Sequence, residues 1–391
     1  MSLTILLNFS RSDTIVSALK VSEVIILFLA FCLSHLSSAF AACSPPQFDQ
    51  PHYVGSINTT KITEASGIAV SRANPGVLYT HNDGTSGKIY AISTDAQLLA
   101  TFDPGKNVDD TEDIAVGPGP NPGTSYIYLG DIGSNTESRD KVRVLQIPEP
   151  TVDLSWAQDP VSRNLGNAEV FTLVYPDGKY NAETLMIDGN LGELFIATKQ
   201  TGLARIYRAR LNALSAAQDN PLEFIGEISF SIASGGDISA DGRYIAIRNE
   251  SFALLWVKQP NQSAAEALFG EYTGLPLVGK PGEPNGEAIA FAPDSSGYYT
   301  ISEGGGQPLF FFPRLFAGND GVPQFTASPR RTAEGWRFDV TGCPGTTVSL
   351  LKSTDLRGWQ IVSAHQLTSE QDAFVDPDQS TESFYRLEAS Q

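Results

Sequence analysis

Apolar residues occur along the chain in short runs that are separated by turns rich in Gly, Asn and Asp. The first group comprises residues 66–71 (SGIAVS), 77–83 (VLYTHND), 88–93 (KIYAIS) and 97–102 (QLLATF). Short apolar runs bounded by turn residues predict β-strands joined by hairpins. Similar groups begin near residues 112, 183, 237 and 287, so the pattern predicts repeated units of four antiparallel strands.

This repeat predicts a β-propeller over residues 48–317. The units begin about 46, 71, 54 and 50 residues apart, mostly near the length of a propeller blade. The last unit lacks an outer strand, which residues 53–57 could supply, thereby closing the ring and covering its open edge. We therefore expect an all-β fold with five blades, or six if the polar insertion at 148–167 is a degenerate blade.

The remaining segment, 322–391, has a different pattern and predicts a small β-sandwich. It contains five or six short runs, with clear alternation in GWRFDV at 335–340. The large apolar side chains expected in its core are Trp336, Trp359, Phe374 and Tyr385.

The first 41 residues predict an export signal. An apolar run at 24–33 follows Arg11 and Lys20, and Ala39-Phe40-Ala41 fits an A-x-A cleavage site. A second interpretation makes Cys43 a lipid-modified N-terminus. Either one predicts a periplasmic, cell-surface or extracellular protein without a transmembrane span. In an oxidising compartment, an unmodified Cys43 could form a disulfide with Cys343.

The overall charge narrows the classes of partner. The formal net charge is −18, which argues against nucleic acid or an anionic membrane. It favours a cation or a small-molecule or protein ligand, and it leaves the oligomeric state open.

Acidic residues recur at the start of the first strand of every unit. In a propeller this strand borders the central channel, so these residues are the candidate metal ligands: Glu64, Glu112, Glu183, Asp237 and Glu287. The second strand runs back to the same face and ends in the candidate catalytic residues: Asp83, Asp131, Glu303, Lys199 and Arg248. The predicted funnel is therefore acidic and holds two cationic side chains.

Such a cluster needs compensation. Two carboxylates about 6 Å apart repel by roughly 2–3 kcal/mol at an effective dielectric constant near 20. Raised pKa values, pairing with Lys199 and Arg248, or a bound metal would relieve this repulsion. An oxygen-rich site suits Ca²⁺, whereas four His residues without a His/Cys cluster argue against zinc. Alternatively, each acid accepts backbone N–H groups from the next blade and binds nothing.

A further pattern is formed by Asp110, Glu112, Asp113, Asp131, Asn135, Arg139, Glu183, Asp237, Arg248, Glu287 and Glu303. With these residues, the segment 60–315 resembles a family of secreted bacterial β-propeller proteins, loosely similar to phytase-like, NHL-type and WD-repeat propellers. Ser134 stands where the family usually has an acid (GDIGDN). The resemblance implies a site on the acid-lined face but no reaction.

The tail is similar to a small module that ends many secreted bacterial proteins, for which attachment or display is the usual inference. Its marks are Ser353-Thr354-Asp355-Leu356, Trp359, Asp376 and Phe384-Tyr385-Arg386.

Three functional hypotheses follow from the sequence. The first is a binding propeller whose acidic funnel holds a cation. The second is a Ca²⁺-dependent hydrolase of a phosphoester or lactone, with His81 as a further candidate base. The third is a structural or adhesive envelope module whose acids are occupied by backbone amides.

Overall fold

A computed structural model describes residues 45–259, 262–315, 323–342, 346–367, 371–378 and 383–390. The predicted export signal and the predicted pairing of Cys43 with Cys343 lie outside these residues. Within them, strands dominate, so the prediction of an all-β chain is confirmed. Across the described ranges, no helix has the length and apolar character needed to cross a membrane.

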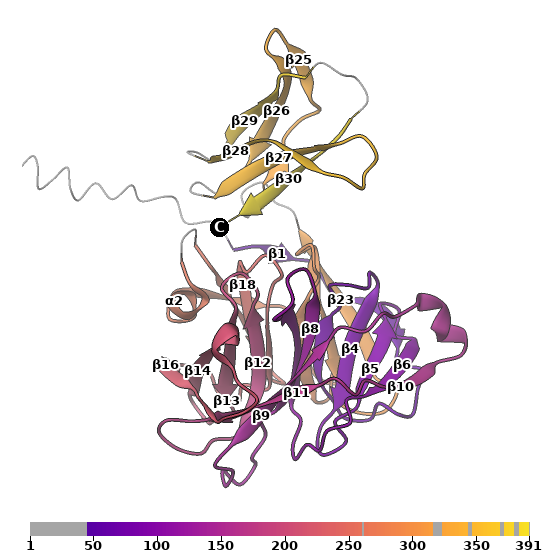
Figure 1. The fold of residues 1–391 in the computed structure, drawn as a ribbon, viewed down its shortest axis with the longest axis vertical. Helices are drawn as coiled ribbons and strands as arrows, with labels where there is room; N and C mark the ends of the chain where they lie inside the picture. Colours follow the sequence, from indigo (N-terminus) through magenta and orange to yellow (C-terminus); the bar gives the residue numbers. More distant parts are fainter. Residues whose placement is uncertain are drawn as a thin grey trace, which may run out of the picture. The chain divides into compact units, whose positions relative to one another are not determined.

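The described residues 45–259 and 262–315 form five sheets (Figure 1). In each of the first four sheets, four strands lie side by side in the order in which they occur along the chain. The fifth sheet combines three such strands with two strands from the N-terminal end. The first sheet contains β3 (Ala65–Val70), β4 (Val77–Asn82), β5 (Ile89–Ser93) and β6 (Leu98–Asp103). The second contains β7 (Asp113–Pro118), β8 (Ser125–Asp131), β9 (Val142–Pro148) and β11 (Glu169–Val174). These four-stranded sets are antiparallel throughout.

The third and fourth sheets repeat this order. The third contains β12 (Ala182–Asp188), β13 (Glu193–Thr198), β14 (Ala204–Arg210) and β16 (Glu223–Ile228). The fourth contains β17 (Gly235–Ile238), β18 (Tyr244–Arg248), β19 (Ala253–Val257) and β20 (Tyr272–Leu275). The helical elements described are short: η1 (Leu154–Gln158), η2 (Leu211–Ala213) and α2 (Ala264–Leu268).

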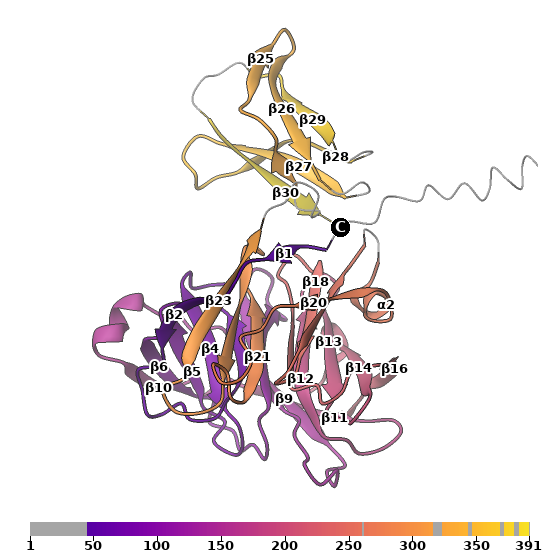
Figure 2. The same cartoon turned by 180° about the vertical axis from the view of Figure 1, so that it is seen from behind.

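The fifth sheet joins the two ends of this region. It contains β21 (Gly286–Phe291), β22 (Gly297–Ser302) and β23 (Pro308–Leu315). Its outer edge is formed by N-terminal strands, β2 (His52–Ser56) and β1 (Gln47–Phe48), which both pair with β23 (Figure 2). The segment expected to supply an outer strand therefore does pair at this position.

Two further short strands extend these sheets. From the polar insertion, β10 (Val161–Asn164) pairs in parallel with β6 of the first sheet. Similarly, β15 (Asn220–Pro221) pairs in parallel with β11. The described insertion therefore adds an edge strand to a neighbouring sheet instead of forming a sheet of its own.

The core lies between successive sheets. The first strands contact one another in the order β3, β7, β12, β17, β21 and back to β3. Apolar clusters fill each junction; Tyr79 and Ile127, for example, share one cluster between the first and second sheets. Ile68 and Ile301 share another between the first and fifth sheets. Burial of these clusters is the main force that holds the sheets together.

Strand pairing places a defined set of residues at one edge of this five-sheet region. The start of each first strand pairs with the end of the second, as in Ala65 with Asn82 and Gly235 with Arg248. The loops that follow the second strands therefore lie at the same edge as the starts of the first strands.

The C-terminal residues form two small antiparallel sheets. One contains β24 (Gln324–Phe325), β25 (Arg330–Thr332), β26 (Gly335–Thr341) and β29 (Gln371–Asp376). The other contains β27 (Thr347–Ser353), β28 (Gln360–Gln366) and β30 (Phe384–Ser390). Phe338 and Phe374 of the first sheet pack with Val348 and Leu350 of the second. Trp336 and Tyr385 lie against this core, whereas Trp359 stacks under the Arg386 guanidinium.

Candidate functional site

Carboxylates gather at the edge where the first strands begin. We call the following residues the acidic mouth: Asp83, Asp110, Glu112, Glu183, Lys199, Glu287 and Glu303. Glu183 and Glu287 lie at register shifts, between Ala182 and Thr184 and between Gly286 and Ala288. A bulge re-aims a side chain that regular pairing would send elsewhere. Both carboxylates consequently reach the same ammonium group, that of Lys199.

Lys199 provides a positive charge to the half of the mouth that contains Glu183 and Glu287. Its Nζ forms an ion pair with Glu183 Oε2 and lies 3.5 Å from Glu287 Oε1. Burial opposes the charge on Lys199, but the neighbouring carboxylates more than compensate and raise its pKa. Burial also raises the pKa of Glu183, an effect that Lys199 opposes. Lys199 therefore stays positively charged at neutral pH.

Glu303 extends this half toward solvent. It follows β22, and its carboxyl shares a hydrogen bond with that of Glu287. Burial, together with Glu287, Glu64 and Asp83, raises the pKa of Glu303 to about 8. Two carboxyl groups in such contact favour retention of one proton between them.

The other half of the mouth, the acid triad Asp83, Asp110 and Glu112, has no such partner. One oxygen from each lies within 4.8 Å of the others. Among the described residues, none of the three takes part in an ion pair. At 4.8 Å, each ionised pair would repel by about 3 kcal/mol at an effective dielectric constant near 20.

Glu112 is the most constrained member of the triad. Its side chain makes no hydrogen bond to a described residue, although Glu112 is only 2% exposed. Burial, followed by Glu183, Asp83 and Asp110, raises its pKa to about 10. In the same triad, Asp83 has one buried oxygen, Oδ1, without a hydrogen-bond partner among the described residues. Buried unsatisfied oxygens of this kind favour a proton or a cation.

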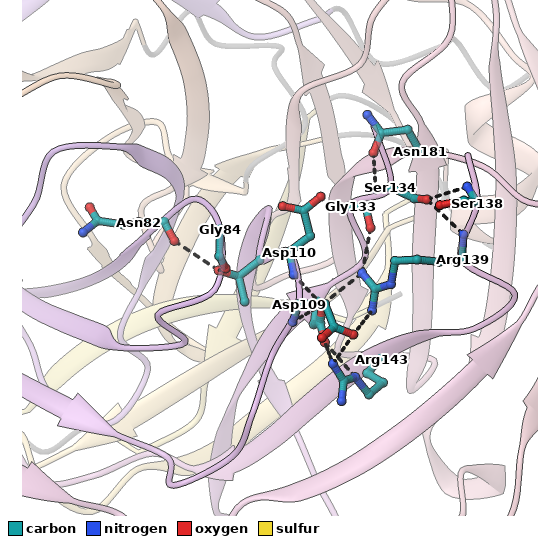
Figure 3. A network of polar contacts seen from close by, with 12 residues as sticks. Asn82, Gly84, Asp109, Asp110, Gly133, Ser134, Ser138, Arg139, Arg143 and Asn181 are labelled. Atoms are coloured by element: carbon teal, nitrogen blue, oxygen red, sulfur yellow. Dashed lines mark hydrogen bonds and ion pairs between the residues drawn. The ribbon is translucent and has the colours of Figure 1, made fainter. Parts of the chain in front are cut away.

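Gly133 gives the triad its space. A Cβ atom at this position would lie 2.2 Å from Glu112 Oε1 and 2.5 Å from Asp110 Oδ2. Figure 3 shows the Gly133 backbone beside Asp110, with Arg139 donating to the Gly133 carbonyl oxygen at 2.6 Å. Only glycine allows both carboxylates to lie this close to the backbone.

A buried bracket holds Asp110 in position. Asp131 is fully buried, and its Oδ1 accepts the backbone N–H groups of Asp109 and Asp110 at 3.1 and 2.9 Å. Arg139 and Arg143 form ion pairs with the same carboxylate, and both also reach Asp109 (Figure 3). The structure therefore gives Asp131 a positioning role, with its oxygens occupied by protein groups.

Ser134 and Asn181 order the adjoining turn. The Ser134 hydroxyl accepts the backbone N–H groups of Ser138 and Arg139 at 3.1 and 3.2 Å (Figure 3). The Asn181 side chain accepts the Ser134 N–H at 2.6 Å and donates to Glu183 at 3.3 Å. Ser134, where the resembling family has an acid, thus fixes the turn that carries Arg139.

Three predicted site residues lie apart from the mouth's central contacts. Arg248 is fully buried, and it bonds Glu283 at 3.2 Å and the Ala288 carbonyl oxygen at 3.0 Å. Asp237 lies farther along its strand and accepts the backbone N–H of Phe291 at 2.8 Å. Glu64 is exposed. The expected ring of five acids is therefore an uneven group in which Glu112, Glu183 and Glu287 approach one another.

The chain offers a physical reason for this difference. The first and fourth sheets carry a serine where the other three sheets carry an inward-facing glutamate. Ser66 lies at the register shift of β3, and Ser234 directly precedes β17. Ser66 donates to the Glu112 backbone oxygen at 2.6 Å and so links two strands. Glu64 and Asp237 lie two and three positions away from these serines, outside the inward-facing register.

His81, considered as a base, lies beneath this edge. It is fully buried, and its Nδ1 lies 3.0 Å from the Asn82 carbonyl oxygen. Burial lowers the pKa of His81 to about 4, so the ring is neutral at physiological pH. Its Nε2 faces Gly67, where an added Cβ would approach it to 2.8 Å.

Sequence reasoning did not assign Asp110, Gly133 or Glu283 to a site. Asp110 could have been found, because DDTED places three further acids beside Glu112. Glu283 precedes the fifth unit by several residues, and nothing in the pattern predicts its pairing with Arg248. Gly133 matters because the side chains of Glu112 and Asp110 lie against its backbone, a contact that the sequence pattern does not predict.

No protein-family model matches the chain, and no curated protein matches it. Among solved structures, it is similar to the β-propeller domain of Cps50 (Swd1) from Myceliophteria thermophila, with 13% sequence identity and a TM-score of 0.36. The similarity covers 68% of this chain and 99% of that domain. A similarity this low carries no information about a ligand, and membership of the secreted propeller family stays a sequence-based prediction.

Proposed function

We propose that this protein is an exported, five-bladed β-propeller that binds a divalent cation, preferably Ca²⁺, in its acidic mouth and presents it to a ligand or partner. Five sheets whose first strands contact in cyclic order support the blade count. The pairing of β2 with β23 supports closure of the ring by an N-terminal strand. The predicted signal at 1–41 supports export to a compartment where Ca²⁺ is available.

The observation that carries the proposal is the acid triad, whose carboxylates form no ion pair with any described residue. Three carboxylate oxygens within 4.8 Å can contact one ion, since Ca²⁺ binds oxygen at about 2.4 Å. A bound cation would remove the repulsion among Asp83, Asp110 and Glu112, whereas Lys199 relieves only the other half of the mouth. Ca²⁺ accepts incomplete protein coordination completed by water.

The hydrolase hypothesis receives less support from the geometry. Asp131 and Arg248, two of its five candidate residues, are fully buried and engaged by other protein groups. Asp83, Glu303 and Lys199 remain at the mouth, and they are equally suited to binding. We therefore propose a binding function and no reaction.

A thermal-shift screen tests this proposal. Protein stripped with EDTA is melted at pH 8 alone, with Ca²⁺ and with Mg²⁺. A ligand that binds only the folded state raises the melting temperature. We expect Ca²⁺ to raise Tm by several degrees and EDTA to reverse the change; equal Tm values in all conditions would refute the proposed cation site.

A further inference from the structure

The edge that carries the acidic mouth also carries two exposed apolar side chains, Ile232 and Phe252, which we call the apolar rim. They are 37% and 41% exposed. Ile232 lies between β16 and β17, and Phe252 follows β18, so strand order places both at the mouth's edge. Both lie on loops, where binding residues are common.

The rim is tied to the loop of Lys199. The Ile232 backbone N–H donates to the Gln200 carbonyl oxygen at 2.8 Å, one residue beyond Lys199. Gly202 donates to the Ser231 hydroxyl at 3.0 Å, and Asn249 donates to the Ser231 carbonyl oxygen at 2.8 Å. These bonds hold Ile232 next to the loop of Lys199. The Phe252 backbone N–H donates to Asn249 Oδ1 at 2.9 Å, which ties Phe252 to the same network.

Ile232 is held in an unusual conformation. Its φ is 58°, in the left-handed region that β-branched residues rarely adopt. Strained residues of this kind concentrate at ligand-binding positions.

The charge of the mouth specifies the other part of the ligand. Of its six carboxylates, one retains the proton held between Glu287 and Glu303, one is balanced by Lys199 and two by a divalent ion, so two remain without a compensating charge. The nearly buried Glu112, whose carboxylate makes no hydrogen bond to a described residue, belongs to the triad that would hold the ion. A cationic group on the ligand would meet this remaining charge.

We propose that the mouth binds a polypeptide segment of a partner protein that carries a Lys or Arg side chain beside an apolar residue. The basic group enters the acidic mouth, and the apolar side chain packs on Ile232 and Phe252. The inference rests on the proposed binding function and adds its ligand class. A peptide fits because open glycines flank the mouth: a Cβ at Gly84, Gly202 or Gly305 would have no neighbour within 4 Å.

Fluorescence anisotropy with four labelled heptapeptides in saturating Ca²⁺ tests the inference. The first has a Phe-Lys-Leu core; in the others Gln replaces Lys, Glu replaces Lys, or Ser replaces both apolar residues. We expect the first peptide to bind at least about tenfold more tightly than the others, as expected for loss of one buried apolar or charged contact. Equal affinities, or no binding by any peptide, would overturn the inference.

Two variants separate recognition from folding. Ile232→Gly removes the side chain and relieves the backbone strain, which offsets part of the lost packing, so the variant is expected to fold. It should lose the advantage of the Phe-Lys-Leu peptide, as should Phe252→Ser. Leu191→Ser, which alters an exposed apolar residue in the β12–β13 turn at the opposite edge, should bind like the parent. If Leu191→Ser and Ile232→Gly lost the same amount of affinity for the Phe-Lys-Leu peptide, the proposed role of the apolar rim would be contradicted.

The Ca²⁺ thermal shift distinguishes the two proposals. Ile232→Gly should keep the full shift, because it leaves the acid triad unchanged. A Ca²⁺ shift without peptide binding refutes the peptide inference alone, whereas peptide binding without a Ca²⁺ shift refutes the cation site. If free phenethylamine binds as tightly as the Phe-Lys-Leu peptide, a small amphiphilic amine replaces the peptide as the ligand, and the inference is overturned.

Discussion

Arg143 donates a hydrogen bond from Nε to the buried carboxylate of Asp131 at 2.7 Å, and this pair supports the loop that carries Asp110. Asp131 binds the backbone N–H groups of Asp109 and Asp110 with its other oxygen. The pair thus links β8 and β9 to one member of the acid triad.

The variant Asp131→Asn should therefore lose stability as well as cation affinity. It leaves Arg139 and Arg143 without their buried counter-charge, for which we expect a loss of about 3–5 kcal/mol in the free energy of unfolding. Urea denaturation measures this loss. A variant within about 0.5 kcal/mol of the parent would contradict the positioning role.

Gly133→Ala should weaken Ca²⁺ binding through a steric effect. Its Cβ would lie 2.2 Å from Glu112 Oε1, so the carboxylates of Glu112 and Asp110 must move apart. We expect affinity to fall about tenfold or more, measured by titration of Ca²⁺ against Tm. Gly305→Ala is the matched control, because its Cβ would meet nothing within 4 Å; equal affinities of the two variants would contradict this account.

Stability without metal should fall as pH rises. Burial and neighbouring acids raise the pKa of Glu112 to about 10 and that of Glu303 to about 8, above their ordinary value of 4.5. Between the ordinary and raised values the folded protein binds more protons than the unfolded chain, so deprotonation destabilises the folded state. Melting in EDTA across this range checks the sign.

Ca²⁺ should oppose this trend. Protons compete with the ion at low pH, so the Ca²⁺ thermal shift should increase as pH rises from about 5 to about 8. A Tm in EDTA that climbed steadily over this interval, or a Ca²⁺ shift larger at the acidic end, would be inconsistent with the arrangement of carboxylates.

Lys199→Met should destabilise the protein mainly at alkaline pH. It leaves Glu183 and Glu287, which are 3% and 7% exposed, without their shared ammonium group. We expect a loss of about 3 kcal/mol at pH 8 and a smaller one at pH 5, where the carboxyls hold protons. Denaturation at both pH values measures the difference, and Glu183→Gln in the same background should recover part of the loss. A pH-independent loss would indicate a packing effect instead.

The sequence predicted the strands well because each buried run is bounded by turn residues. Residues 77–83 and 88–93 were expected as neighbouring strands, and β4 and β5 occupy them. It also indicated the N-terminal segment that pairs with β23, because the last unit lacked a fourth run. These features depend on the local pattern of apolar and turn residues and on the number of strands expected in each unit.

The site was less predictable because it depends on register and long-range packing. A register shift turns Glu183 and Glu287 inward, while Glu64 remains outside. Arg248 was expected in the funnel, but its partner Glu283 comes from a loop whose course the alternation of residues does not specify. A one-residue change of register moves a side chain to the opposite face, so these differences lie beyond periodicity alone.

Isothermal titration calorimetry of Ca²⁺ into EDTA-treated, desalted protein at pH 8 tests the central claim most directly. The parent protein and Glu169→Gln, which alters an exposed carboxylate on β11, should each bind the ion at the acid triad. Glu112→Gln should lose this binding. Without metal it should melt at a higher temperature than the parent, because folding at pH 8 no longer requires a proton to be taken up by this buried carboxyl. Absence of Ca²⁺ binding in the parent, or equal binding in Glu112→Gln, would contradict the account.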